Sequence, residues 1–422
     1  MKNYAIIGFG CAGLSAARGI RKTDAEGRIC VFSETKEPPF CPMLTTYYAA
    51  GKISPDAVFP FGDLSSIKKE LNLEIFSNTS VSKVRADEKT VELCDGRKMQ
   101  FDSILIATGA SALVPAFLEK AKDRFLLMRT LEDAKRLKDF IDHHSIKKAA
   151  VIGASMVGIK VAEVLFDKGI ETTLIDGASW LFPLAAYEKT ARDMQQRLED
   201  KGLQFLFDAQ VADIGDGVVK LADGRILETE LICLCVGTKT NVRLLANTDV
   251  VKGESVKINS GIVVDEHMRT NVDGIYAAGD CCEGKNLQTG ETAVIGLWAN
   301  AAAQGECAGR NMAGEDEVYY GNILHNITHF FGMDFIGLGD VSMSGTYYEF
   351  CAPDYYIGAV VDDGKLNSIN IFGNYKISGI LKNYLTKRLL DEQSSLTIAQ
   401  RGILMKEGIS GPFLDILEGK NK

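Results

Sequence analysis

The sequence predicts an α/β protein that has two units built on parallel sheets and an α+β part at its C-terminal end. Short apolar runs at 4–7, 104–107, 149–152 and 172–175 alternate with amphipathic helical stretches, the pattern of a parallel sheet covered by helices. Two of these runs lead into glycine-rich turns about 145 residues apart. After about residue 320, aromatic and β-branched residues alternate around Asp362-Asp363-Gly364, which predicts antiparallel strands joined by a hairpin turn.

The composition is that of a globular protein, and the charge favours small molecules or other proteins as its binding partners. The chain has 422 residues, of which 46% are hydrophobic and 24% charged, enough for roughly two to four domains. The formal net charge of −9 opposes binding to nucleic acid or to an anionic membrane, because both require concentrated Lys and Arg.

The cysteine pattern favours a reducing cytoplasm. Ten cysteines are scattered without the spacing of a disulfide scaffold, and the sequence contains no CxxC pair, so we expect no zinc or iron–sulfur site within this chain. No apolar run approaches the roughly 20 residues that span a bilayer, and we expect no membrane insertion.

The first glycine-rich turn predicts a dinucleotide site. Gly8, Gly10 and Gly13 follow a strand, and Glu34 follows the next strand, 21 residues after the third glycine. In this arrangement the first glycine makes the turn, the second lets the backbone approach a pyrophosphate and the third lets helix pack on strand. The helix N-terminus faces the phosphates and the acid binds a ribose.

Three further motifs follow in order: "LIATGA" at 105–110, "CVGTKTN" at 235–241 and "GIYAAGD" at 274–280. Together with the first turn they resemble the FAD-dependent pyridine nucleotide-disulfide oxidoreductase superfamily over about residues 1–320. The resemblance implies two Rossmann-like three-layer domains: an FAD-binding domain at 1–113 and 246–320, and an NAD-binding domain at 114–245. It also implies a C-terminal α+β interface domain at 321–422, and hence a homodimer.

The resemblance also implies which residues bind the cofactors. Asp280 would hydrogen-bond the ribitol chain of the flavin, and a helix from 297 onward would point its N-terminus at the reduced ring. Trp298 either covers the ring edge or packs in the core. Outside the second glycine turn, the implied cofactor-binding residues are Gly8, Gly10, Cys11, Ala12, Gly13, Glu34, Cys41, Pro42, Val81, Thr108, Gly109, Gly237, Gly279, Asp280, Leu297 and Trp298.

The second glycine-rich turn, "VIGASMVG", resembles the NAD site of the family. The residues implied for NAD are Gly153, Ser155, Met156, Val157, Gly158 and Asp176. An acid at 176 favours the free 2′-hydroxyl of NADH over the phosphate of NADPH. Two positions depart from the family: Ser155 replaces the middle glycine, and Lys160 stands where relatives have a glutamate. A degenerate site on a merely structural helix is the alternative.

The stretch "FCPMLTTYYAAGKI" at 40–53 lies beside the flavin ring in the family. It lacks the CxxxxC pair of disulfide reductases, and Met43 occupies the register of the single redox cysteine in NADH oxidases. "PMLTT" resembles the rubredoxin and ferredoxin reductase branch, in which a basic residue stands where this chain has Cys41. We therefore hypothesise that Lys160 supplies the cation and lowers the pKa of Cys41, which makes both residues catalytic candidates. Cys41 as a small apolar filler is the alternative.

These observations favour an FAD-dependent NADH:acceptor oxidoreductase whose acceptor is a redox protein or a partner subunit. The first alternative is an NADH oxidase, a peroxidase or a small-molecule reductase that uses Cys41. The second is a flavoprotein subunit with a structural or electron-relay role and a degenerate NAD site. His325 and His329 share a possible helical face, and we interpret both as structural.

Overall fold

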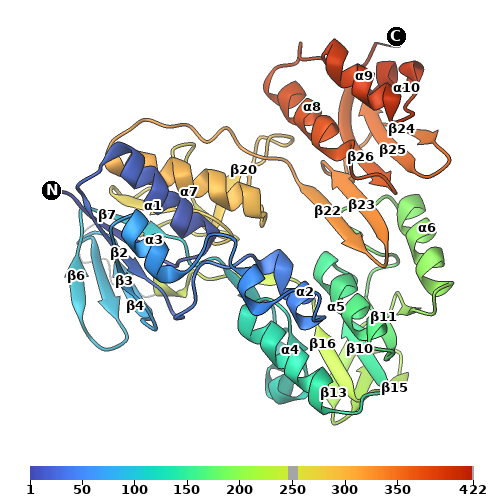
Figure 1. Ribbon diagram of the computed structural model, residues 1–422, viewed down its shortest axis with the longest axis horizontal. Helices are drawn as coiled ribbons and strands as arrows, with labels where there is room; N and C mark the ends of the chain where they lie inside the picture. The colour runs from blue at the N-terminus through green and yellow to red at the C-terminus, as the bar shows by residue number, and fades with distance from the viewer. Residues whose placement is uncertain (246–254, 421–422) are drawn as a thin grey trace. The chain divides into compact units, whose positions relative to one another are not determined.

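The computed structural model describes residues 1–245 and 255–420, which form two compact units (Figure 1). Unit 1 comprises Met1–Thr45, Ile53–Ser111 and Thr238–Asn322. Unit 2 comprises Thr46–Lys52, Ala112–Gly237 and Ile323–Lys422. The chain thus leaves unit 1 briefly after Thr45, and again after Ser111, before it returns at Thr238.

Unit 1 is built on a five-stranded parallel sheet in the order β19-β7-β1-β2-β3. The side chains of its central strand, from Tyr4 to Ile7, are all buried, as expected of a parallel sheet that is covered on both faces. The strands are β1 (Asn3–Ile7), β2 (Arg28–Phe32), β3 (Leu73–Phe76), β7 (Ser103–Ile106) and β19 (Ile275–Ala277).

Two helices of unit 1, α1 (Cys11–Thr23) and α7 (Trp298–Ala313), pack side by side (Figure 1). Glycines of α7 make this approach possible. A Cβ atom added at Gly305 or Gly309 would lie 2.2 Å from the carbonyl oxygen of Ala12 or Ala16. The helix expected from residue 297 onward is therefore confirmed, and its backbone lies directly against that of α1.

Two small sheets and four short helical segments complete unit 1. The antiparallel sheet β4-β5-β6 contributes Val84 and Val91 to the same core as α1 and α7. The elements are β4 (Val81–Arg85), β5 (Thr90–Leu93), β6 (Lys98–Gln100), β18 (Ile262–Val263), β20 (Cys282–Lys285), β21 (Thr292–Ala293), η1 (Pro42–Leu44), η2 (Pro55–Val58), η4 (Arg243–Leu245) and α3 (Leu64–Glu70). The short strands β8 (Ala110–Ala112) and β17 (Thr238–Thr240) lie where the chain changes units.

Unit 2 repeats the parallel design with the order β12-β11-β10-β16-β9. Its strands are β9 (Leu126–Leu127), β10 (Lys148–Ile152), β11 (Glu171–Ile175), β12 (Gln204–Leu206) and β16 (Leu231–Leu234). The associated elements are α2 (Thr45–Ala49), η3 (Ala116–Arg124), α4 (Leu131–His143), α5 (Met156–Asp167), α6 (Glu188–Glu199), β13 (Val211–Gly215), β14 (Val218–Leu221) and β15 (Ile226–Glu228). The predicted α/β class with two parallel sheets is confirmed.

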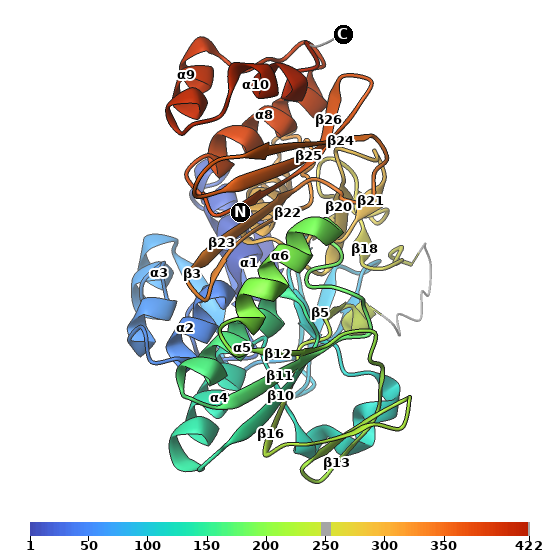
Figure 2. The same cartoon turned by 90° about the vertical axis from the view of Figure 1, so that its right-hand side faces the viewer.

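The C-terminal part of unit 2 is an antiparallel sheet with helices on one side (Figure 2). Asp363 and Gly364 form the expected hairpin turn, both with positive φ, as a two-residue turn of this kind requires. In the order of the sheet the strands are β22 (His325–Phe330), β23 (Met333–Leu338), β26 (Lys365–Phe372), β25 (Tyr356–Asp362) and β24 (Thr346–Cys351), and the helices are α8 (Ser378–Leu390), α9 (Ile398–Lys406) and α10 (Gly411–Leu417).

Hydrogen bonds join this C-terminal sheet to α6 within unit 2. The Tyr187 backbone N–H donates to Asn370 Oδ1 over 2.8 Å, and the Tyr187 hydroxyl pairs with that of Ser368 at 2.7 Å. Ser368 and Asn370 are fully buried, so loss of either bond would leave a polar group without a partner. The domain boundaries implied by the resemblance stay a prediction.

The helical face proposed for His325 and His329 is wrong, because both residues lie in strand β22. Strand β22 pairs with β23 over its whole length. His325 is buried, and its Nε2 lies 2.9 Å from Lys382 Nζ. Burial, with the Lys382 charge, lowers the pKa of His325 to about 4.

Candidate cofactor-binding site

The first glycine turn has the geometry of a dinucleotide-binding loop. Gly8 has φ +99°, and an added Cβ would lie 2.2 Å from the carbonyl oxygen of Ala107. At Gly13 an added Cβ would meet the carbonyl oxygen of Gly8 at 2.1 Å. Gly10 has open space beside it and precedes α1, which it cannot cap because it has no side chain. The N–H groups of Cys11 and Ala12 thus begin a helix that is open to an anion.

Four further residues implied for the first site lie at the ends of strands in unit 1. Glu34 follows β2 and is exposed, so its carboxylate is accessible to a ribose. Val81 begins β4 and is half-buried against the core of unit 1. Thr108 and Gly109 follow β7, where the Thr108 hydroxyl donates to the carbonyl oxygen of Asn241 over 2.6 Å.

Asn241 was not selected from the sequence, although it ends the "CVGTKTN" motif. Its Nδ2 donates to the carbonyl oxygen of Thr108 over 3.0 Å, and its Oδ1 accepts from the Ser111 hydroxyl over 2.8 Å. These bonds fasten the motif at 105–110 to the segment at 238–241. The only feature of the sequence that could have indicated these bonds is that both segments belong to motifs.

The segment at 279–298 forms the other side of the candidate site within unit 1. Gly279 has φ +83°, and Asp280 is half-buried, with its carboxylate 3.7–3.8 Å from the Cβ that an alanine at 296 would carry. Leu297 is the N-cap of α7, without a side-chain cap. Trp298 stacks on Phe61 with ring centroids 5.6 Å apart and planes 5° apart, and its carbonyl oxygen accepts from the Cys11 thiol over 3.5 Å.

Cys41 is buried at the start of the short helix η1, which has Pro42 in its first position. The Cys41 N–H donates to the carbonyl oxygen of Val58 over 2.9 Å. Burial raises the pKa of the Cys41 thiol, although the N–H groups of Met43 and Leu44 oppose this rise. Within unit 1, therefore, the surroundings favour the neutral thiol.

The second glycine turn repeats the backbone geometry of the first. Gly153 has φ +110°, and an added Cβ would lie 2.4 Å from the carbonyl oxygen of Cys235. At Gly158 an added Cβ would meet the carbonyl oxygen of Gly153 at 1.9 Å. Met156 and Val157 form the first two positions of α5. Gly237 is exposed with φ +110°.

Two side chains occupy the second turn. Ser155 caps α5: its hydroxyl accepts from the Gly158 N–H over 3.1 Å and donates to the carbonyl oxygen of Cys235 over 3.0 Å. Asp176 follows β11, and its carboxylate accepts from the N–H groups of Ala154 over 2.6 Å and Ala178 over 2.8 Å. A dinucleotide at this turn would therefore find the N–H groups of Ala154 and Gly158 already paired.

Lys160 is nearly buried, and its charge is paired within unit 2. Its Nζ forms an ion pair with Glu163, donates to the carbonyl oxygen of His329 over 2.8 Å and lies 4.4 Å from the centre of the Tyr47 ring. Glu163 also accepts from the Phe331 N–H over 2.9 Å. Cys41 belongs to unit 1, so the hypothesis that Lys160 lowers its pKa stays a prediction.

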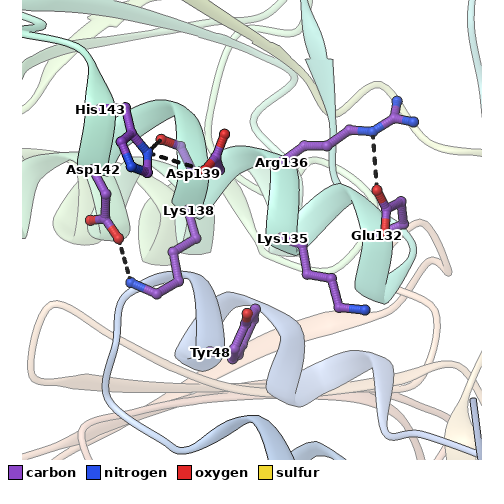
Figure 3. A pocket seen from close by; sticks show the side chains of 8 residues that line it. All are labelled: Tyr48, Glu132, Lys135, Arg136, Lys138, Asp139, Asp142 and His143. Atoms are coloured by element: carbon purple, nitrogen blue, oxygen red, sulfur yellow. Dashed lines mark hydrogen bonds and ion pairs between the residues drawn. The ribbon is translucent and has the colours of Figure 1, made fainter.

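A shallow charged depression of about 430 Å³ lies over α4 in unit 2 (Figure 3). Ion pairs join neighbouring turns of the helix, such as Lys138 to Asp142 at 2.6 Å. The lining residues are Tyr48, Glu132, Lys135, Arg136, Lys138, Asp139, Asp142 and His143, and none of them is a predicted cofactor residue. No residue of either glycine turn lines this depression.

Over residues 1–245 and 255–420, no helix is long and apolar enough to cross a bilayer, and no group of His, Cys, Asp and Glu could hold a metal. The ten cysteines are free thiols, and eight of them are buried. Redox chemistry at a disulfide thus has no preformed pair in the described part of the chain.

Several named oxidoreductases are similar to this chain in sequence or in fold. The NADH-dependent phenylglyoxylate dehydrogenase subunit epsilon of Aromatoleum evansii is 28% identical over 397 residues, 91% of each chain. The NADH-rubredoxin oxidoreductase of Clostridium acetobutylicum is 26% identical over 405 residues, 93% of this chain and 96% of that protein. The fold matches putidaredoxin reductase, solved in a covalent complex with putidaredoxin, with a TM-score of 0.84, 20% identity and coverage of 100% and 99%.

The family model of the pyridine nucleotide-disulphide oxidoreductases matches residues 2–305. This match spans the two parallel sheets and both glycine turns. The chain belongs to the pyridine nucleotide-disulphide oxidoreductase family.

Proposed function

We propose that this protein oxidises NADH and passes the electrons through a bound FAD to a redox protein or to a partner subunit. The observation that carries this proposal is the repeated strand-turn-helix geometry at Gly8–Gly13 and Gly153–Gly158 in a chain whose cysteines are all free. Two of its relatives are named as a subunit of an NADH-dependent dehydrogenase and as an NADH-rubredoxin oxidoreductase.

The first turn fits the pyrophosphate of FAD. Gly10 leaves open space in front of the uncapped N-terminus of α1, and this N-terminus attracts the negative phosphates. Glu34 would bind the adenosine ribose, and Asp280 the ribitol. When bound, FAD supplies the chemistry: it accepts a hydride from NADH and releases electrons singly or in pairs.

The N-terminus of α7 would stabilise negative charge on the reduced flavin, because the helix dipole is positive there. The second turn would hold NADH. The α5 N-terminus faces the pyrophosphate, and Asp176 selects the unphosphorylated ribose by hydrogen bonding to its hydroxyls and repelling a 2′-phosphate. Neither role requires a residue of this chain to donate or accept a proton.

An anaerobic titration with NADH tests the proposal. The purified protein, reconstituted with FAD, should lose its flavin absorbance near 450 nm on addition of about one equivalent of NADH, and NADPH should act much more slowly. A protein that binds FAD but is not reduced by NADH would contradict the proposal and support an electron-relay subunit with a degenerate NAD site.

The oxidase reading requires Cys41 to react, and burial of its thiol opposes this. We propose that Cys41 packs beside the flavin as a neutral thiol. The variant Cys41→Ser should keep the rate of flavin reduction by NADH. Turnover with oxygen or peroxide that disappears in Cys41→Ser would instead identify an NADH oxidase or peroxidase. Alkylation of Cys41 that slows in Lys160→Ala would show that Lys160 activates it.

The assembly and the cellular location are further proposals. The C-terminal region at 321–422 is proposed to form a homodimer interface, which light scattering of the chain and of a variant truncated before residue 321 would test. The scarcity of cysteine pairs favours the cytoplasm. Copurification from native cells would identify the acceptor protein.

A further inference from the structure

Helix α7 carries three buried amide side chains: Asn300, Gln304 and Asn311. Each bonds to backbone outside the helix. Asn300 donates to the carbonyl oxygen of Ile295 over 2.9 Å, and Asn311 donates to those of His267 and Glu317 over 2.9 and 2.8 Å. Such buried amides are costly unless they are paired, so each of them fixes the segment that it contacts.

Gln304 contacts the segment that precedes Asp280. Its Oε1 accepts from the Gly279 N–H over 2.9 Å and from the thiol of Cys282 over 3.7 Å. Gln304 is 1% exposed, so water cannot replace these donors. The bond therefore spans from α7 to the "AAGD" turn immediately before the residue assigned to the ribitol.

The orientation of the Gln304 amide is determined by its surroundings. A flipped amide would place a donor against the Gly279 N–H, which is itself a donor. In the observed orientation, Nε2 lies over Gly284, where an added Cβ would approach it to 2.3 Å. Position 284 has no side chain, which leaves room for the amide, and Nε2 makes no hydrogen bond there to any residue that the structure describes.

Close packing confines the turn that Gln304 holds. Gly279 has φ +83°, and an added Cβ would lie 3.0 Å from the Cβ of Ala12 in α1 and 3.7 Å from that of Ala301 in α7. The turn therefore lies between the helix that would bind the pyrophosphate and the helix that would face the flavin ring. A shift of the Gly279 backbone would move Asp280 relative to both.

We propose that Gln304 is a positioning residue for flavin binding, which holds the Gly279 backbone so that the Asp280 carboxylate meets the ribitol chain. This inference rests on the proposed function. Gln304 touches no cofactor itself and acts through the Gly279 N–H. Its loss should therefore weaken FAD binding more than it lowers the stability of the fold.

The test compares Gln304→Leu with Asn311→Leu. Asn311 is a buried amide of the same helix, but it bonds to His267 and Glu317 instead of the "AAGD" turn, so it is a matched control. We expect Gln304→Leu to raise the Kd of FAD for the apoprotein by about 10-fold or more. Asn311→Leu should lower the urea midpoint at least as much but change the FAD Kd by less than about two-fold.

Two further variants separate positioning from general damage. Gln304→Glu, which burial keeps as the neutral acid, retains an oxygen that can accept from the Gly279 N–H, and it should restore FAD binding to within about three-fold of the wild type. Gly284→Ala pushes against Nε2 without altering Gln304, and it should weaken FAD binding and shift the visible bands of the bound flavin. The bands of Asn311→Leu should match those of the wild type.

The outcomes distinguish this inference from the proposed function. A wild-type apoprotein that takes up no FAD would overturn both. A wild type that binds FAD, together with a Gln304→Leu variant of equal affinity, would overturn only the positioning role. Equal losses of FAD affinity in Gln304→Leu and Asn311→Leu would also overturn it, because they would show a general effect of destabilising α7.

Discussion

The two glycine turns of this protein have the same backbone geometry but differ in the side chains that lie at the turn. Gly8 and Gly153 have φ of +99° and +110°. A Cβ atom added at the third glycine of each turn would lie 2.1 Å from the carbonyl oxygen of Gly8 and 1.9 Å from that of Gly153. The middle position differs. Gly10 leaves the N-terminus of α1 open, whereas Ser155 caps α5 with its own hydroxyl.

The acidic residue is also open to a ligand at the first turn and bonded within the protein at the second. Glu34 is exposed after β2, whereas the Asp176 carboxylate accepts N–H groups from the turn itself. A ligand at the first turn gains hydrogen bonds without breaking any within the protein. At the second turn, a ligand that bonds to the Gly158 or Ala154 N–H must displace an existing hydrogen bond, which makes its net binding weaker. This difference suits a retained FAD at the first turn and an exchanging NADH at the second.

The largest effect is expected from substitutions that block each glycine turn separately with a side chain. Gly13→Val should abolish FAD binding, and Gly158→Val should abolish reduction by NADH while the protein keeps its flavin. In each case the new Cβ overlaps a carbonyl oxygen, and the loss of affinity should exceed about 100-fold. Flavin content and anaerobic NADH titration measure the two effects.

A matched control for both variants is Gly402→Val, because an added Cβ there meets nothing within 4 Å. It should keep both the flavin and the response to NADH. A Gly13→Val variant that keeps its flavin but is no longer reduced by NADH, or a Gly158→Val variant that loses its flavin, would show that the two turns do not act on separate ligands.

The second effect concerns the selectivity of the second turn. Asp176→Ser removes the charge that repels a 2′-phosphate, and it should raise the ratio of kcat/KM for NADPH over NADH by about 10-fold or more. Stopped-flow reduction of the flavin by each nucleotide measures this ratio. Glu34→Ser serves as the control, and an equal change of the ratio in that variant would contradict the assignment of NADH to the second turn.

A smaller effect is expected from making the second turn resemble the first. Ser155→Gly frees the Gly158 N–H for a phosphate, and it should lower the Kd of NADH by up to about five-fold, the equivalent of one hydrogen bond. Glycine also serves as an N-cap, so the thermal midpoint should change little. Weaker NADH binding in Ser155→Gly would mean that the serine hydroxyl itself binds the nucleotide.

The smallest effect concerns pH at the first turn. A helix N-terminus ordinarily favours a thiolate, but burial raises the pKa of Cys11 to about 11. Cys11 should thus remain a neutral thiol from pH 6 to 9, and the FAD Kd should not vary through its titration there. As the pH rises towards 11, the new negative charge should weaken FAD binding.

Cys11→Ser provides the comparison, because a serine does not ionise in this range. Its FAD Kd should stay level between pH 9 and 10.5, where that of the wild type begins to rise. A wild-type Kd that already rises near pH 8, with a level Cys11→Ser curve, would place a thiolate at the open end of α1 and contradict the effect of burial.

Local sequence patterns were sufficient for the turns and for many of the elements. Each glycine turn depends on residues at most five positions apart, and the helix from 298 depends on its own alanines and polar spacing. The pattern failed at His325 and His329, where a spacing of four fits both a helical face and an alternating strand. Pairing of β22 with β23 decides between them, and that pairing requires a partner segment.

The family, the α/β class and the two glycine turns could be predicted from residue order, because these depend on spacing along short stretches of chain. The partners of the polar side chains could not, and they become visible only in the folded protein. Lys160 is paired with Glu163 and His329, and Gln304 holds Gly279. Such partners are set by which elements pack together, because a buried charge or amide oxygen is stabilised by the donors or acceptors that packing brings next to it.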